Sequence, residues 1–167
     1  MSKKNLDWEN LGFEYHETNK RYIANYKDGS WSEGKLSSES NVVINESAAV
    51  LQYCQQVFEG LKAYTTKDGE IVTFRPDLNA ERMLNSAEGL QMPPFPKNKF
   101  LEAVNQVVEA NLDWVPPYGT GAALYLRPFI FGSKDVVAIK PAEEFQFRLY
   151  ATPVGPYFKG GVKPLTL

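Results

Sequence analysis

Two helix-like segments stand next to each other in the middle of the chain, with strand-like segments before and after them. The first is expected to run from about residue 76 to 90, since Pro76 suits a first helical turn and Pro93-Pro94 would stop the helix. The second covers Asn98–Trp114 and ends at Pro116-Pro117. Parallel sheets need a crossover, usually a helix, between successive strands, so two helices in a row argue against a doubly wound sheet and for an antiparallel one.

The apolar residues of both segments recur at helical spacing, so each helix should bury one face. The expected buried positions are Ala80, Met83, Leu84, Ala87 and Leu90 in the first helix, and Phe100, Leu101, Val104, Val107, Val108 and Leu112 in the second. The two helices are therefore expected to pack on one side of the sheet.

Short turns join several of the strand-like segments, which is typical of hairpins. Arg21–Lys27 and Ser30–Leu36 flank Asp28-Gly29, a dipeptide that suits the positive φ angles of a tight turn. A second hairpin is expected for Gly60–Thr66 and Glu70–Arg75.

Further elements complete the expected order. Asn41–Ile44 should be a short strand, and Ser47 should cap a brief helix that ends near residue 51. Ala122–Phe131 and Glu144–Thr152 are apolar and aromatic enough for central strands, with Pro128 at an edge or a bulge. The expected fold is therefore α+β, an antiparallel β-sheet with helices packed on one side.

Charge and composition exclude several classes of function. The 18 basic and 20 acidic residues among 167 give a formal net charge of −2, which provides no basic surface for nucleic acid or anionic lipid. Cys54 is the only cysteine and His16 the only histidine, so a disulfide within the chain and a histidine-rich metal site are excluded. No signal peptide or transmembrane stretch is visible, so a cytoplasmic location without a membrane partner is expected.

The residues alone show no complete catalytic set, but three of them are candidates for anion recognition. Arg82 lies near the start of the first helix, where its planar fork could bind a phosphate, although a solvated helix arginine is the commoner role. Tyr125 and Arg127 are two positions apart in a strand, so both leave one face while Leu124 and Leu126 leave the other. Such a pair could hold a carboxylate, or it could belong to an ordinary exposed face.

Four stretches, taken together, resemble one known family. They are Tyr53–Tyr64 (YCQQVFEGLKAY), Phe74–Leu90 (FRPDLNAERMLNSAEGL), Trp114–Phe131 (WVPPYGTGAALYLRPFIF) and Pro153–Gly161 (PVGPYFKGG). Their order and spacing are similar to those of the branched-chain amino acid aminotransferases, which are fold-type IV enzymes dependent on pyridoxal phosphate. The resemblance runs from about residue 10 to the end of the chain.

The resemblance implies a division of the chain and roles for several residues. Residues 1–152 would form the small N-terminal domain, and residues 153–167 would enter the loop to a C-terminal domain that is absent here. Arg82 is similar to the arginine that binds the cofactor phosphate. Tyr125 and Arg127 would lie at the substrate carboxylate, Tyr15, Tyr53 and Phe58 would line the pocket for the branched side chain, and Ile139 would reach into the pocket of the second subunit of a homodimer.

The resemblance also implies that the chemistry is incomplete within this chain. The family needs a lysine that forms a Schiff base with pyridoxal 5'-phosphate, and its matching position lies beyond Leu167. The parent enzyme would transfer the amino group of leucine, isoleucine or valine to 2-oxoglutarate, and the chain alone would be inactive. One alternative is a non-catalytic binding or dimerisation module with the same fold. Another is a D-amino acid transaminase or aminodeoxychorismate lyase, which lack the full FEGLKAY and LY-x-RP combination.

Overall fold

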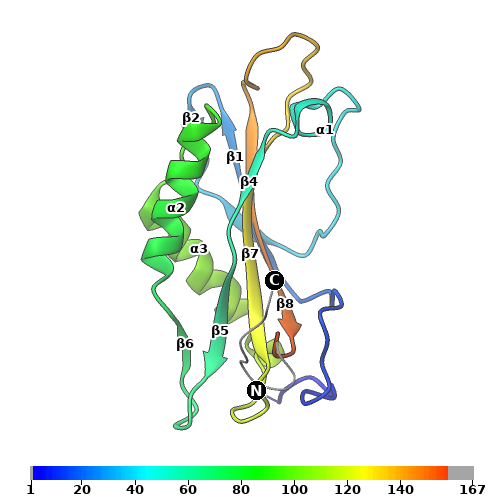
Figure 1. The fold of residues 1–167 in the computed structure, drawn as a ribbon, viewed down its shortest axis with the longest axis vertical. Coiled ribbons are helices and arrows are strands. Elements are labelled where there is room, and N and C mark those ends of the chain that lie inside the picture. The colour runs from blue at the N-terminus through cyan, green and yellow to red at the C-terminus, as the bar shows by residue number, and fades with distance from the viewer. Residues whose placement is uncertain (1, 158–167) are drawn as a thin grey trace, which may run out of the picture.

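The computed structural model describes residues 2–157, and this part of the chain folds into a curled antiparallel sheet with its two long helices on one side (Figure 1). In chain order the elements are β1 (Arg21–Lys27), β2 (Ser30–Trp31), β3 (Lys35–Ser37), α1 (Ala49–Tyr53), β4 (Gln56–Phe58), β5 (Leu61–Thr65), β6 (Ile71–Thr73), α2 (Pro76–Gly89), α3 (Lys97–Ala110), a 3-10 helix (Leu112–Trp114), β7 (Ala123–Gly132) and β8 (Phe145–Val154). The strands are ordered β2-β1-β8-β7-β5-β6, with β3 beside β1 and β4 beside β7. The predicted α+β fold is confirmed. No helix in residues 2–157 is long and apolar enough to cross a membrane.

Strands β7 and β8 form the centre of the sheet, as predicted. Their ladder runs from Ala123 opposite Val154 to Gly132 opposite Phe145. Because β8 continues to Val154, it enters the segment predicted as an interdomain loop; residues 158–167 of that segment lie outside the described part of the chain. Side chains alternate between the two faces of a strand, so this ladder directs one set of residues toward the helices and the other set away from them.

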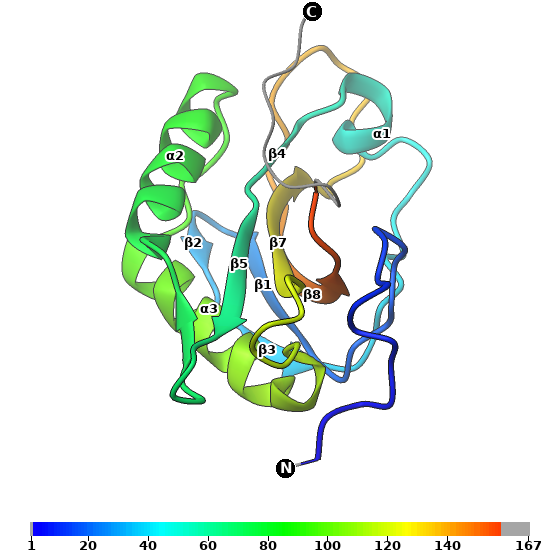
Figure 2. The same ribbon diagram turned by 60° about the horizontal axis from the view of Figure 1, so that its bottom comes forward.

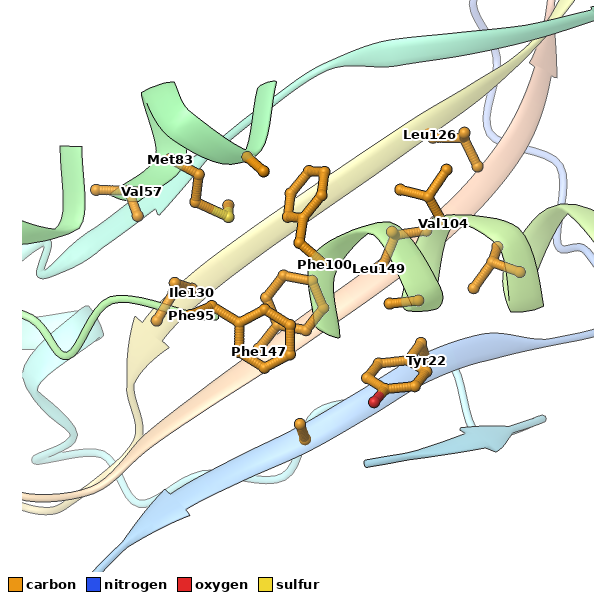
Figure 3. Close-up of a cluster of buried hydrophobic side chains, with 14 of the residues drawn as sticks. Tyr22, Val57, Met83, Phe95, Phe100, Val104, Leu126, Ile130, Phe147 and Leu149 are labelled. Atoms are coloured by element: carbon orange, nitrogen blue, oxygen red, sulfur yellow. The ribbon is translucent and has the colours of Figure 1, made fainter. Parts of the chain in front are cut away.

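Helices α2 and α3 lie on one side of the sheet (Figure 2), and the face toward them carries the hydrophobic core (Figure 3). Phe147 of β8 stacks on Phe95 with 3.8 Å between the ring centroids, and it also meets Phe100 of α3 and Tyr22 of β1. Met83 reaches the same cluster from α2 (Figure 3). Burying each such side chain contributes about 1.5–3 kcal/mol, so this cluster holds both helices against the sheet.

The predicted helices and hairpins are confirmed, with small changes at their ends. Helix α2 starts at Pro76, and α3 ends at Ala110 ahead of the 3-10 helix. The Asp28-Gly29 turn has φ angles of 52° and 82°, as the two central residues of a type I′ hairpin require. Leu90, predicted to be buried, is 47% exposed because α2 ends one residue before it.

Two predictions about the segment before α1 are wrong. Asn41–Ile44 forms no strand, and the strand in this region is β3, Lys35–Ser37. Gly34, with a φ of 78°, divides the predicted strand Ser30–Leu36 into β2 and β3, and β3 then takes the free edge of β1. Ser47 does not cap α1, since its hydroxyl donates to Asn45 Oδ1 instead.

Pro128 was expected at an edge or a bulge, and it lies instead within the central strand β7. Its carbonyl oxygen accepts a hydrogen bond from the Glu59 N–H at 2.9 Å. The nitrogen and the carbonyl of one strand residue point to the same side, so the missing N–H of Pro128 faces the junction between β4 and β5. The register is unbroken across this junction, with Phe58 opposite Phe129 and Leu61 opposite Leu126.

Candidate active site

The face of the sheet that points away from α2 and α3 carries polar, charged and aromatic side chains. Leu124 and Leu126 are fully buried on the helix side, which confirms the predicted alternation along β7. The residues between them therefore point to the other face. Across the central ladder the facing pairs on this side are Tyr125 with Thr152, Arg127 with Tyr150, and Phe129 with Arg148.

The N-terminal segment lies along this second face, on the side of the sheet opposite the helices (Figure 2). The His16 N–H donates to Thr152 Oγ1 at 2.9 Å, which fixes the segment against β8. As a result, the Tyr15 ring meets the Tyr150 ring edge-on, with 6.0 Å between the centroids. A residue distant in sequence thus becomes a wall of the face that β7 and β8 form.

Arg127 lies within a cavity of about 420 Å³ on this face. The cavity is lined by Phe13, Tyr15, Lys62, Tyr125, Arg127, Tyr150, Thr152, Val154 and Tyr157. Arg127 Nε donates to the Tyr125 hydroxyl at 2.9 Å, and its guanidinium carbon lies 4.4 Å from the centroid of the Phe58 ring. These two contacts hold the guanidinium in one orientation between two aromatic rings, so its remaining N–H groups are available to a planar anion.

Gly60 explains how Tyr125 can approach β5 so closely. A Cβ atom at this position would lie 2.5 Å from the Tyr125 hydroxyl oxygen, so the tyrosine would have to move away. The glycine of the FEGLKAY motif therefore makes room for the hydroxyl that positions Arg127.

Arg82, on α2, is paired with a buried carboxylate. Glu59 is 8% exposed and accepts from Arg82 Nε at 2.9 Å and from Arg82 Nη2 at 2.5 Å. Asn79 Nδ2 donates to the same carboxylate at 2.8 Å. The hydrogen bonds and the charge of Glu59 raise the pKa of Arg82, whose own side chain is 62% exposed. Glu59 therefore orients the guanidinium and leaves Nη1 and one Nη2 hydrogen directed elsewhere.

The arginines suit an anionic ligand better than a metal ion. Arg82 lines a second cavity of about 400 Å³, and this cavity shares Lys62 and Tyr125 with the cavity around Arg127. Residues 2–157 contain no group of three or more histidine, cysteine, aspartate or glutamate side chains placed to hold a metal ion. Each of the two adjoining cavities thus contains an arginine whose orientation is fixed by neighbouring side chains. Together they could bind the two ends of a ligand with two negatively charged groups.

No protein-family model matches the chain, but individual proteins do. Over 161 residues it is 53% identical to a branched-chain-amino-acid aminotransferase of Haemophilus influenzae, an alignment that covers 96% of this chain. The chain belongs to the branched-chain aminotransferase family. It spans about half the length of the curated relatives it matches, 47% in the case of the Haemophilus influenzae protein.

Solved structures of branched-chain aminotransferases share the fold. The structure of the Thermoproteus uzoniensis enzyme with norvaline superposes with a TM-score of 0.66 at 26% sequence identity, covering 85% of this chain and 43% of that one. The Escherichia coli branched-chain amino acid aminotransferase has a TM-score of 0.64 at 21% identity and covers 84% of this chain and 41% of that one. The latter likeness shows the fold alone.

The structure brings most of the predicted branched-chain aminotransferase site residues to one face, and sets two apart. Tyr15, Tyr125 and Arg127 line the first cavity, Phe58 stacks on Arg127, and Arg82 lines the adjoining cavity. Tyr53 and Ile139 line a separate cavity of about 300 Å³, where the Tyr53 hydroxyl donates to the Val137 carbonyl at 2.6 Å. Ile139 is 94% exposed, so in this chain alone it contacts little.

Several residues of this site were not predicted as site residues. Tyr150 and Thr152 alternate with the apolar residues Leu149 and Ala151 in the sequence, and the same two-residue spacing that identified Tyr125 and Arg127 could have found them. Glu59 belongs to the quoted FEGLKAY motif, but no local pattern shows that it reaches Arg82, 23 positions away. Lys62 lines both cavities, which could follow only from knowing that β5 pairs with β7.

Proposed function

We propose that this chain is the part of a branched-chain amino acid aminotransferase that carries the substrate-pocket wall and one phosphate-binding arginine. In this proposal residues 1–152 form the small domain and residues 153–167 lead to a further domain. The whole protein would transfer the amino group of leucine, isoleucine or valine to 2-oxoglutarate in the cytoplasm. The observation that carries the proposal is the fixed guanidinium of Arg127, among aromatic rings and next to the cavity of Arg82.

Arg127 would bind the carboxylate of the amino acid. Its contacts with Tyr125 and Phe58 restrict the guanidinium before the substrate arrives, so little conformational entropy is lost on binding. Tyr15 and Phe58 would surround the branched side chain with aromatic surface, and Tyr125 would lie beside the carboxylate with Arg127. Tyr150 lines the same cavity, where its hydroxyl can donate a hydrogen bond, and burial raises its pKa.

The residues of the second cavity fit the phosphate of pyridoxal 5'-phosphate. Glu59, itself held by Asn79, holds Arg82 from behind, and the remaining N–H groups of the arginine fork match phosphate oxygens. When bound, the cofactor supplies the electron sink that transamination needs. Arg82 would hold the phosphate, and the shared wall of Lys62 and Tyr125 would separate it from the substrate carboxylate at Arg127.

Ligand binding tests this proposal directly. In an NMR titration, 4-methyl-2-oxopentanoate should shift signals of the first cavity in a saturable way, and Arg127→Gln should weaken its binding about tenfold or more, because a charge-assisted hydrogen bond contributes about 1.5–3 kcal/mol. Glyoxylate, which has the same charge and no branch, should bind more weakly. Arg75→Gln, on the exposed surface, is the matched control and should leave the affinity for 4-methyl-2-oxopentanoate unchanged. Equal binding by the Arg127→Gln chain would contradict the proposal.

The chain by itself should not transaminate, because no lysine in it occupies the position that the family uses. With pyridoxal 5'-phosphate, leucine and 2-oxoglutarate, no glutamate should form, and borohydride treatment should leave no stoichiometric adduct on a single lysine by mass spectrometry. Such an adduct, at Lys62 for example, would show that this chain carries the covalent chemistry after all.

A binding or dimerisation module is the second candidate function, and exposed apolar surface favours it. Val137 and Ile139 are 86% and 94% exposed on one loop, and Phe74, shortly before α2, is 84% exposed. Surfaces of this kind are commonly covered by a partner. Homodimerisation through the loop with Ile139 would fit both candidates, and sedimentation velocity would measure it. A monomer at all concentrations would argue against the module.

A further inference from the structure

We infer that a further cavity on the same face, built around Arg21 and Arg148, binds the carboxylate of a small organic acid. This site is separate from the proposed substrate and cofactor positions and does not depend on them. Its volume is about 410 Å³, and its walls include Tyr15, Tyr150, Phe129 and Ser40.

The two arginines are among the most deeply buried polar residues described. Arg21 of β1 is 2% exposed and Arg148 of β8 is 5% exposed. Strand pairing brings them together, since β1 lies beside β8 in the sheet. Buried guanidinium groups normally have a carboxylate partner at hydrogen-bond distance, because an uncompensated buried charge is costly.

The partners that the structure gives these arginines are mainly neutral. Arg21 donates to the carbonyl oxygens of Ser38 at 2.6 Å and Thr18 at 3.3 Å. Arg148 donates to the carbonyl oxygens of Glu39 at 2.7 Å and Asn41 at 3.1 Å, and to the side-chain oxygen of Gln146 at 3.3 Å. These bonds fix both guanidinium groups in place without neutralising them.

The nearby carboxylates, those of Glu17 and Glu39, are exposed to solvent. The side chain of Glu17 is 58% exposed, and its oxygen is 3.6 Å from Arg21 Nη1. The exposed side chain of Glu39 accepts a hydrogen bond from the Asn41 N–H. Burial and the charge of Arg21 lower the pKa of Arg148, and the charge of Glu39 offsets this in part. The positive charge is therefore only partly compensated, and a bound anion would complete the compensation.

The walls indicate which anion fits. A planar guanidinium fork matches a carboxylate in two parallel hydrogen bonds. Tyr150 stands edge-on between Tyr15 and Phe129, with centroid separations of 6.0 and 6.2 Å. Three aromatic rings suit an apolar group and not a strongly hydrated inorganic ion. A volume of about 410 Å³ is at the small end of ligand sites. The ligand class is therefore a small carboxylic acid with an aromatic or branched apolar part.

The cavity is distinct from the one around Arg127 but touches it. Tyr15 and Tyr150 line both cavities. The register sets the separation: Arg127 faces Tyr150, and Arg148 lies further along the ladder, opposite Phe129. A carboxylic acid bound at Arg148 would thus contact a wall of the proposed substrate pocket from the neighbouring cavity.

Benzoate is a suitable probe, and the Arg127→Gln chain is a suitable background because it removes the anion-binding group of the first cavity. In this background, an NMR titration should show saturable shifts for residues around Arg148. Adding Arg148→Gln should weaken benzoate binding at least tenfold, while Arg148→Lys should retain part of it. Benzyl alcohol, which has the same ring without the charge, should not produce the same shifts, and inorganic phosphate should bind more weakly than benzoate.

A second pair of variants covers the case in which Arg148→Gln fails to fold. Ser40→Glu places a carboxylate at the wall of the cavity and should block benzoate while leaving both arginines intact. Ser40→Gln, of equal size and no charge, should still bind. Undiminished benzoate binding by both Arg148→Gln and Ser40→Glu, or equal shifts with benzyl alcohol, would overturn the inference. The proposed function is tested with 4-methyl-2-oxopentanoate on the chain that retains Arg127, and this inference is tested with benzoate on the Arg127→Gln chain. A negative result in one test therefore leaves the other unaffected.

Discussion

Replacing Glu59 by glutamine changes one buried charge and almost nothing of the shape of the side chain. In the native chain one carboxylate oxygen accepts from Arg82 Nε, and the other accepts from Arg82 Nη2 and Asn79 Nδ2. An amide has only one acceptor oxygen. In Glu59→Gln the NH2 group therefore faces Arg82 Nε in one orientation, and both Arg82 Nη2 and Asn79 Nδ2 in the other. The variant therefore leaves at least one donor unsatisfied in a region where Glu59 is 8% exposed.

The expected loss of unfolding free energy is about 2 kcal/mol. The bond from Asn79 is either lost or made to a neutral oxygen, and a buried hydrogen bond to a charged group contributes about 1.5–3 kcal/mol against about 0.5–1.5 kcal/mol for a neutral one. The Arg82 side chain is 62% exposed, so solvent screening reduces its two bonds to about 0.5 kcal/mol together. For a chain of this length, about 2 kcal/mol corresponds to a fall in Tm of about 4–8 °C.

Urea unfolding followed by tryptophan fluorescence would measure this loss, and the chain supplies a matched control. Arg75 also donates through Nε and Nη2 to the two oxygens of one carboxylate, Asp77, at 2.9 and 2.8 Å, but this pair lies at the surface. Arg75→Gln should therefore shift the urea midpoint far less than Glu59→Gln. Equal midpoints for the two variants would refute the claim that burial of Glu59 makes its pair with Arg82 important.

Three further predictions concern single residues. The hydrogen bonds and charge of Arg75 lower the pKa of Asp77 from 3.8 to about 2. The contribution of this carboxylate to stability is therefore complete above about pH 4 and is lost as the pH falls through 2. An NMR titration should find a pKa of about 2 for Asp77 in the native chain and a pKa close to 3.8 in Arg75→Gln. Gly60→Ala should displace the Tyr125 hydroxyl and weaken 4-methyl-2-oxopentanoate binding several-fold in the NMR titration, with the fold retained by circular dichroism. Ile139→Asp should shift any dimer of the chain toward monomer in sedimentation velocity.

The sequence was sufficient for elements whose signals lie within a few residues. Pro76 and the helical spacing of the apolar residues placed α2, and Asp28-Gly29 placed the first hairpin, because turn and helix geometry depend on neighbouring residues. Asn41–Ile44 was misjudged for the opposite reason. Its β-branched residues suit a strand, but Val43 is 96% exposed and β3 already occupies the edge of β1 that it would need.

The sites depended on contacts that no local pattern contains. Tyr125 and Arg127 could be placed on one face because two positions in a strand determine it, whereas Glu59 meets Arg82 only through the packing of α2 on the sheet. Arg21 and Arg148 are far apart in sequence, and only the pairing of β1 with β8 brings them to one cavity.

Strands β7 and β8 carry the core on one face and the candidate active site on the other, so two variants can test whether the two faces are independent. Leu126 is fully buried toward the helices and Arg127 points the other way, so a shift of one residue would exchange them. Burying the guanidinium without a partner would cost several kcal/mol, so the core fixes the direction of the site. Leu126→Ala should then lower the unfolding free energy by about 2–5 kcal/mol through the cavity it leaves. Arg127→Gln should leave stability nearly unchanged and weaken the binding of 4-methyl-2-oxopentanoate at the first cavity about tenfold or more. Loss of stability in Arg127→Gln as large as in Leu126→Ala would show that the two faces are not energetically separate.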